Sequence, residues 1–223
     1  MTTTLAFDVY GTLIDTHGIV AALQPQLGHR AIDFSRAWRD KQLEYSFRRG
    51  LMKQYESFAV CTGQALDHTC SQFGLSLGPA AREKLLDAYR ALPAFKDARE
   101  GLARVREAGF RLFAFSNGPA EAVGSLLAQA GLRDFFLDVV SVDEVKSFKP
   151  DPGVYTHFLQ RAGATGGDAW MISSNPFDVL GALSAGMRAA WVQRSPEALF
   201  DPWGIEPTVT VDSLSDLVAR IHP

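Results

Sequence analysis

The chain has 223 residues, of which 47% are hydrophobic and 21% are charged, as in a globular protein with a sizeable core. This length allows one large domain or a core with an inserted subdomain. The net charge of −3 argues against a nucleic-acid-binding surface. We expect no membrane span, because no apolar run approaches the ~20 residues that cross a bilayer.

The cysteines and the first residues of the sequence bear on its compartment. Cys61 and Cys70 are nine residues apart in a predicted helix, which suits neither a disulfide framework nor a metal knuckle. The first residues lack the basic start and long apolar stretch of a secretory signal. We therefore expect free, buried thiols and a cytoplasmic protein.

The first predicted strand is the apolar run of residues 5–7, which ends at Asp8 and is followed by the turn residue Gly11. The next segment, residues 16–93, has helical periodicity and no convincing strand. We expect its helices to break at Gly28, Gly50, Gly74 and Gly78-Pro79.

From residue 94 onward, predicted strands alternate with predicted helices, which indicates a parallel sheet covered on both faces. The sequence thus predicts an α/β core of residues 1–15 and 94–223, interrupted by a helical insert of residues 16–93. The predicted strands are 112–115, 137–142, 170–172 and 189–192, and the helices are 97–108, 119–131 (beginning at Pro119), 151–162 and 177–185.

Polar side chains follow four of the predicted strands. Ligands of open parallel sheets bind at the carboxyl ends of the strands, so we expect these side chains to meet there. They are Asp8, Tyr10 and Thr12 after the first strand, Ser116 and Asn117 after the second (followed by Gly118, which offers only its backbone), Lys149 after the third, and Ser173, Ser174, Asn175 and Asp178 after the fourth.

These same segments resemble, in the right order, the four motifs of the haloacid dehalogenase superfamily. Within that superfamily, Ser173-Ser174-Asn175 and the insert segment Trp38-Arg39 to Leu43-Glu44-Tyr45 are similar to those of the L-2-haloacid dehalogenases. The resemblance covers nearly the whole chain. It implies a Rossmann-like core with a helical cap, and cleavage of the carbon–halogen bond in small (S)-2-haloacids. It also implies no metal or other cofactor, and a homodimer.

Two positions differ from the phosphatases of that superfamily. Those enzymes carry an acid at the position of Tyr10, which protonates the leaving alcohol, and a second acid at the position of Ser174, which helps to hold Mg²⁺. Halide is a stable anion and needs no proton when it leaves. A Mg²⁺-dependent small-molecule phosphatase stays open as the alternative function. A catalytically inactive binding module fits poorly with intact Asp8, Lys149 and Asp178.

The resemblance and the residue chemistry together predict the catalytic roles. Asp8 is the predicted nucleophile, which forms an ester, and Lys149 is predicted to keep it ionised. Thr12 is predicted to orient Asp8, although a β-branched residue is also common at a strand end. Asp178 is the predicted base for the water that cleaves the ester, and Ser173 and Asn175 are predicted to position that water.

Arg39, Leu43 and Phe47 fall four residues apart and share one face of a predicted helix. We expect the Arg39 guanidinium to lie over the cleft and hold the departing halide. The alternative is an exposed arginine paired with Asp40 or Glu44. Asp40, where relatives are expected to carry a neutral amide, should face solvent because helix neighbours point about 100° apart.

The remaining predicted contacts bind substrate or halide. Backbone N–H groups of residues 116–118, before the helix that begins at Pro119, suit the substrate carboxylate, and helix capping is the alternative. The resemblance implies that Asn117 and Phe177 complete the halide cradle and that Tyr155 belongs to the site. For Tyr155, and for the apolar-wall candidates Tyr10, Leu43 and Phe58, plain core packing stays open.

Overall fold

The sheet is built from short apolar runs that are buried almost throughout, as strands covered on both faces should be. This computed structural model describes residues 2–221, in which six strands pair in the order β3-β2-β1-β4-β5-β6, and every pair is parallel. The α/β fold class is therefore confirmed, with β1 in the middle of the sheet. The strands are β1 (Thr4–Phe7), β2 (Arg111–Ser116), β3 (Asp138–Ser141), β4 (Ala169–Ser173), β5 (Arg188–Val192) and β6 (Val209–Val211).

Successive strand residues point to opposite faces of the sheet, so each face has its own hydrophobic cluster. Leu5 and Phe7 of β1 belong to one cluster, and Ala6 belongs to the other. The first face is covered by α5 (Ala98–Glu107), α6 (Ala120–Gln129) and α9 (Leu217–Arg220), and the second by α7 (Pro152–Ala162) and α8 (Pro176–Ser184).

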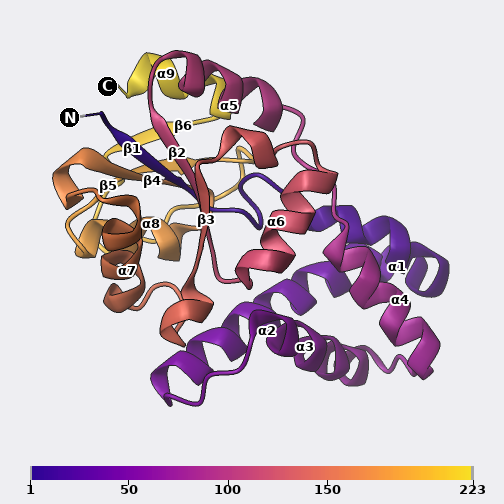
Figure 1. Cartoon of the computed structure of the whole chain (residues 1–223). Helices are drawn as coiled ribbons and strands as arrows, with labels where there is room; N and C mark the ends of the chain where they lie inside the picture. Colours follow the sequence, from indigo (N-terminus) through magenta and orange to yellow (C-terminus); the bar gives the residue numbers. More distant parts are fainter. Residues whose placement is uncertain (1, 222–223) are drawn as a thin grey trace.

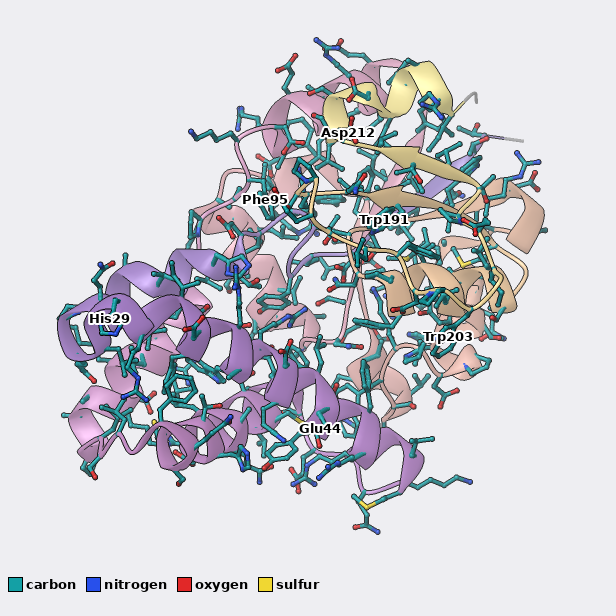
Figure 2. The ribbon with its side chains drawn as sticks, turned by 180° about the vertical axis from the view of Figure 1, so that it is seen from behind. His29, Glu44, Phe95, Trp191, Trp203 and Asp212 are labelled. Carbon is teal, nitrogen blue, oxygen red and sulfur yellow. The ribbon has the colours of Figure 1, made fainter. Side chains whose placement is uncertain are left out.

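The helices of the insert form a group beside the sheet, the cap (Figure 1). The longest of them, α2, buries Phe34 and Trp38 on one stripe against its neighbours. Figure 2 shows the molecule from behind, with His29 and Glu44 on the cap and Trp191 and Asp212 on the core. The cap helices are α1 (Val20–Leu27), α2 (Ala31–Leu51), α3 (Phe58–Phe73) and α4 (Pro79–Arg90).

The chain leaves the core and returns to it along two neighbouring segments. Ile14 forms an antiparallel bridge with Ala94, and the Asp15 N–H donates to the Pro93 carbonyl at 2.8 Å. These contacts place the crossing where the sequence divides into core and insert. The division into a core of residues 1–15 and 94–223 and a cap of residues 16–93 stays a proposal about folding units.

Several boundaries differ from the prediction. Helix α2 continues through Gly50 to Leu51, because a single glycine costs a helix only about 1 kcal/mol. Pro119 caps α6 instead of opening it. The short strand β6 and helix α9 were not predicted, because three residues such as Val209–Val211 give little local signal.

Two further expectations concern the thiols and the membrane. Cys61 and Cys70 are both free and buried, as predicted. Among the helices of residues 2–221, none combines the length and apolarity that crossing a bilayer requires.

Candidate active site

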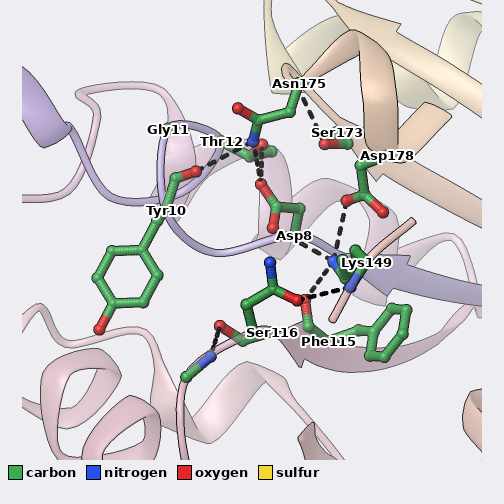
Figure 3. A network of polar contacts seen from close by, with 12 residues as sticks. Asp8, Tyr10, Gly11, Thr12, Phe115, Ser116, Lys149, Ser173, Asn175 and Asp178 are labelled. Carbon is green, nitrogen blue, oxygen red and sulfur yellow. Dashed lines mark hydrogen bonds and ion pairs between the residues drawn. The ribbon is translucent and has the colours of Figure 1, made fainter. Parts of the chain in front are cut away.

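Side chains from several strand ends meet at the carboxyl edge of the sheet (Figure 3). Phe7 of β1 lies in register with Ala114 of β2 and Ile172 of β4, so the residues that follow these three are neighbours. Asp8 comes directly after β1 and lies at the centre of this edge. The structure brings together the six residues predicted to be catalytic, which are Asp8, Thr12, Lys149, Ser173, Asn175 and Asp178.

The Asp8 carboxylate is buried and receives three hydrogen bonds. Its Oδ2 accepts from Thr12 Oγ1 and from Asn175 Nδ2, each at 2.8 Å, and its Oδ1 accepts from Lys149 Nζ at 3.3 Å. The donors come from three different segments of the chain. They fix the carboxylate in one orientation at the floor of the site.

Lys149 links two carboxylates inside the protein. Its side chain is 1% exposed, and Nζ lies 2.9 Å from Asp178 Oδ2 as well as 3.3 Å from Asp8 Oδ1. Nζ also donates to the Phe115 carbonyl at 2.9 Å and lies 4.2 Å from the centre of the Phe115 ring. The Lys149 N–H donates to Asn117 Oδ1 at 2.9 Å, which attaches its loop to the end of β2. A buried ammonium is tolerated here because it is paired and hydrogen-bonded.

Asp178 has no exposed surface, and both of its oxygens have donors, Lys149 at Oδ2 and Tyr155 at Oδ1. Burial raises the pKa of Asp178 above its ordinary value, Lys149 opposes this shift, and the charge of Asp8 reinforces it. Burial, together with Asp178, also raises the pKa of Tyr155 well above its usual value, so its hydroxyl stays a neutral donor.

The Tyr155 hydroxyl reaches Asp178 because α8 carries a glycine there. A Cβ at Gly181 would collide with that hydroxyl and would lie 2.8 Å from Pro150 Cβ. Sequence reasoning did not identify Gly181. A glycine is needed at position 181 because α7 and α8 pack closely there. A contact between two helices cannot be recognised from a local sequence motif.

The loop after β4 is hydrogen-bonded to the loop after β1. Ser174 Oγ donates to the Gly11 carbonyl at 2.7 Å, and the Ser174 N–H donates to Thr12 Oγ1 at 2.9 Å. Within the β4 loop, the Asn175 N–H donates to Ser173 Oγ at 3.1 Å. The hydroxyls of Ser173 and Ser174 therefore hold the shape of the site.

Arg39 of α2 contacts the loop after β1, while its predicted binding of halide stays a prediction. Its Nη2 donates to the Tyr10 carbonyl at 3.3 Å, and its Nη1 donates to Gln42 Oε1 at 2.7 Å. The same Tyr10 carbonyl accepts from Asn175 Nδ2 at 3.1 Å. Asp40 is exposed, as expected, so it does not face this group.

The Tyr10 side chain points away from Asp8, although its carbonyl faces Asn175 (Figure 3). Its ring packs on Phe58 and Tyr89, with ring centres 5.9 Å and 6.2 Å away. Together with Gly118, these three rings line a cavity of about 90 Å³ between cap and core. Tyr10 and Phe58 thus serve both as packing and as the wall of a cavity.

The loop after β2 uses some of its own polar groups internally. The Gly118 N–H donates to Ser116 Oγ at 3.1 Å, and the Gly118 carbonyl accepts from Ser141 Oγ at 2.7 Å. Ser116 and Asn117 are buried. Part of the predicted anion site is therefore already bonded within the loop.

Two predicted contacts lie on the cap side of the site. Leu43 is half-buried on α2, one turn beyond Arg39. Phe177, at the start of α8, packs edge-on against Phe47 of α2, with ring centres 5.0 Å apart. This contact joins cap and core next to the loop that carries Asn175.

Sequence reasoning missed three polar residues of the cap, namely Gln42, Thr62 and Tyr89, which form a hydrogen-bonded group behind Arg39. A signal was present, because Gln42 falls on the buried stripe of α2, four residues after Trp38. A polar side chain on such a stripe needs a partner inside the protein.

Comparison with known proteins gives consistent matches. A family model for a haloacid dehalogenase-like hydrolase matches residues 2–186. The (S)-2-haloacid dehalogenase of Pseudomonas sp. (strain YL) is 36% identical over 96% of this chain and 92% of that protein. The haloacetate dehalogenase H-2 of Moraxella sp. (strain B) is 36% identical over 97% of this chain and 96% of that protein. The L-2-haloacid dehalogenase of Xanthobacter autotrophicus, solved with chloropropionic acid covalently bound, has a TM-score of 0.90 and 32% identity over 97% of both chains.

Proposed function

Since the chain belongs to the haloacid dehalogenase-like hydrolases, we propose that it hydrolyses short-chain (S)-2-haloacids to (R)-2-hydroxyacids through an ester on Asp8, without a metal. The observation that carries the proposal is the buried Asp8 carboxylate, which is held by Thr12, Asn175 and Lys149. The named activities of the relatives support it, as does the covalently bound chloropropionic acid in a related structure.

In the first step, an Asp8 oxygen attacks C2 from the side opposite the halogen. A carbon–oxygen bond forms as the carbon–halogen bond breaks, the halide leaves with the bonding electrons, and C2 inverts. Fixing the carboxylate in one orientation favours this attack. We assign halide to Arg39, Asn117 and Phe177, the substrate carboxylate to Ser116, Asn117 and Gly118, and the apolar wall to Tyr10, Leu43 and Phe58.

In the second step, water attacks Cγ of the Asp8 ester, and Asp178 takes a proton from that water. The bond between Cγ and the substrate oxygen then breaks, and Asp178 returns its proton to that oxygen, which releases the 2-hydroxyacid. The second proton of the water is lost from the Asp8 carboxyl group, which restores the Asp8 carboxylate. The configuration set in the first step is kept, because no bond to C2 changes. Ser173 and Asn175 position the water, while Lys149 and Tyr155 hold Asp178 in place. Overall, one water is consumed, and halide and one proton are released.

The residues around Asp8 favour this reaction over Mg²⁺-dependent phosphatase chemistry. Ser174 stands where those phosphatases carry the acid that helps to hold Mg²⁺, and its Oγ donates to the Gly11 carbonyl at 2.7 Å. The Tyr10 hydroxyl points away from Asp8, so it is badly placed to protonate a leaving group.

Halide release in the presence of EDTA tests the proposal. We expect turnover of (S)-2-chloropropionate and little of the R enantiomer, with (R)-lactate as the product, measured by ion chromatography and chiral chromatography. Hydrolysis of p-nitrophenyl phosphate that requires Mg²⁺, with no halide release from either enantiomer, would instead establish the phosphatase.

The raised pKa of Asp178 predicts the pH dependence of turnover. As a base, Asp178 must be unprotonated, so kcat should fall as the pH drops through an apparent pKa above that of an ordinary carboxyl. Steady-state halide release measured across pH reports this fall in kcat.

In the Asp178→Asn variant, intact-protein mass spectrometry should show the ester accumulating. If Asp178→Asn turns over at the wild-type rate, Asp178 is not the base of the second step.

We also propose a homodimer in a reducing, cytoplasmic setting. The cap exposes Leu51 and Met52, which are 86% and 60% accessible, on one end of α2. Both thiols are free. Light scattering after size-exclusion chromatography should give twice the chain mass of 24.4 kDa. A single-chain mass at micromolar concentration would contradict the dimer.

A further inference from the structure

A buried polar network in the cap ends at the Arg39 guanidinium. Gln42, on the turn of α2 after Arg39, has no exposed surface. Its Oε1 accepts from Arg39 Nη1 at 2.7 Å and from the Tyr89 hydroxyl at 3.0 Å. Its Nε2 donates to Thr62 Oγ1 at 2.5 Å. Three cap helices thus contribute to one hydrogen-bonded group behind the predicted halide-binding arginine.

Thr62 determines which end of the Gln42 amide faces Arg39. The Thr62 hydroxyl donates its single hydrogen to the Phe58 carbonyl at 2.7 Å, so towards Gln42 it can only accept. Only Nε2 of the amide can donate, and Oε1 must therefore face Arg39. A second bond, from Trp38 Nε1 to the Thr62 carbonyl at 2.9 Å, holds α3 against α2.

The guanidinium is held at two nitrogens by atoms from different parts of the protein. Nη1 donates to Gln42 of the cap, and Nη2 donates to the Tyr10 carbonyl of the core. Because a guanidinium is planar and rigid, fixing two of its nitrogens fixes the direction of its remaining N–H groups.

We propose that Gln42 and Thr62 are positioning residues, which aim the Arg39 guanidinium at the departing halide and so set how strongly the rate depends on the leaving group. This inference rests on the proposed function. Charge on the halogen develops only as its bond to carbon breaks, so an aligned cation stabilises the transition state more than the bound substrate. Chloride is the poorer leaving group, so its release should suffer more than bromide release when the alignment is lost.

The test compares Thr62→Val, which has nearly the same shape but no hydroxyl, with Thr62→Ser, which keeps the hydroxyl. For each, kcat and KM are measured with (S)-2-chloropropionate and (S)-2-bromopropionate. We expect Thr62→Val to lower kcat/KM for the chloro acid about 10-fold, the effect of weakening one hydrogen bond to a charged group. In Thr62→Val, the bromo-to-chloro ratio of kcat/KM should rise and KM should change little. In Thr62→Ser, the ratio should stay at its wild-type value.

The outcomes separate this inference from the proposed function. If the wild-type protein releases no halide from either acid, the proposed function fails. If the wild type is active and Thr62→Val keeps the wild-type bromo-to-chloro ratio, the positioning role is wrong. Should Thr62→Val not fold, Gln42→Met carries the same test, because it removes the acceptor for Arg39 without adding charge. An unchanged ratio in that variant overturns the inference equally.

Discussion

Replacing Asp8 by asparagine is expected to abolish halide release, with kcat reduced at least about 10⁴-fold, as when other enzymes lose a nucleophile. A neutral amide is a poor nucleophile towards C2, yet it keeps an oxygen that can accept from Thr12. The fold should therefore persist. Halide release measures the loss, and far-UV circular dichroism checks the fold.

The matched control is Asp40→Asn, the same chemical change at an exposed position beside Arg39. Because Asp40 faces solvent, the Asp40→Asn variant should release halide at a rate within about twofold of the wild type. Substantial halide release by Asp8→Asn would exclude the covalent mechanism. A large effect of Asp40→Asn would show that its charge acts on the proposed halide site.

Replacing Lys149 by methionine is expected to cost both activity and stability. The side chain is 1% exposed, and its removal leaves Asp8 and Asp178 buried without their cation. We expect the free energy of unfolding at pH 7 to fall by about 3–5 kcal/mol, and turnover to be lost. Urea denaturation and halide release measure the two effects.

The pH dependence of this variant has a definite sign. The folded-state pKa of Asp178 is already raised by burial, and losing Lys149 removes the charge that opposes the shift. The folded state then binds more protons than the unfolded state, so stability should recover as the pH falls towards the carboxyl range. Lys84→Met, at an exposed position of α4, is the control and should change stability by less than about 0.5 kcal/mol. Equal stability of both variants would mean that Lys149 does not compensate the buried acids.

Much of the core could be predicted from local patterns. Short apolar runs that alternate with helical segments predicted the parallel sheet, and the polar residues after four of those runs predicted the cluster around Asp8. The reason is geometric, because parallel strands bring their carboxyl ends to one edge whatever the loops do. Strand β6 was not predicted, because its three residues form a strand only through pairing with β5.

Side-chain directions within the site could not be predicted in the same way. Tyr10 belongs to the loop that carries Asp8, yet its ring turns towards Phe58 and Tyr89, which come from distant helices. Gln42 likewise has a role only because Thr62 and Tyr89 meet it from α3 and α4. Such directions follow from contacts between elements, and periodicity within one element does not contain them.

The carbonyl at position 10 connects the cap arginine to the core asparagine that holds Asp8. That oxygen belongs to the main chain, so no exchange of the side chain at position 10 deletes it. Natural variation or a saturation library at this position can reshape the apolar cavity while the junction of the two halves persists. A substitution at position 10 can therefore change the apolar cavity without removing the oxygen that joins Arg39 to Asn175.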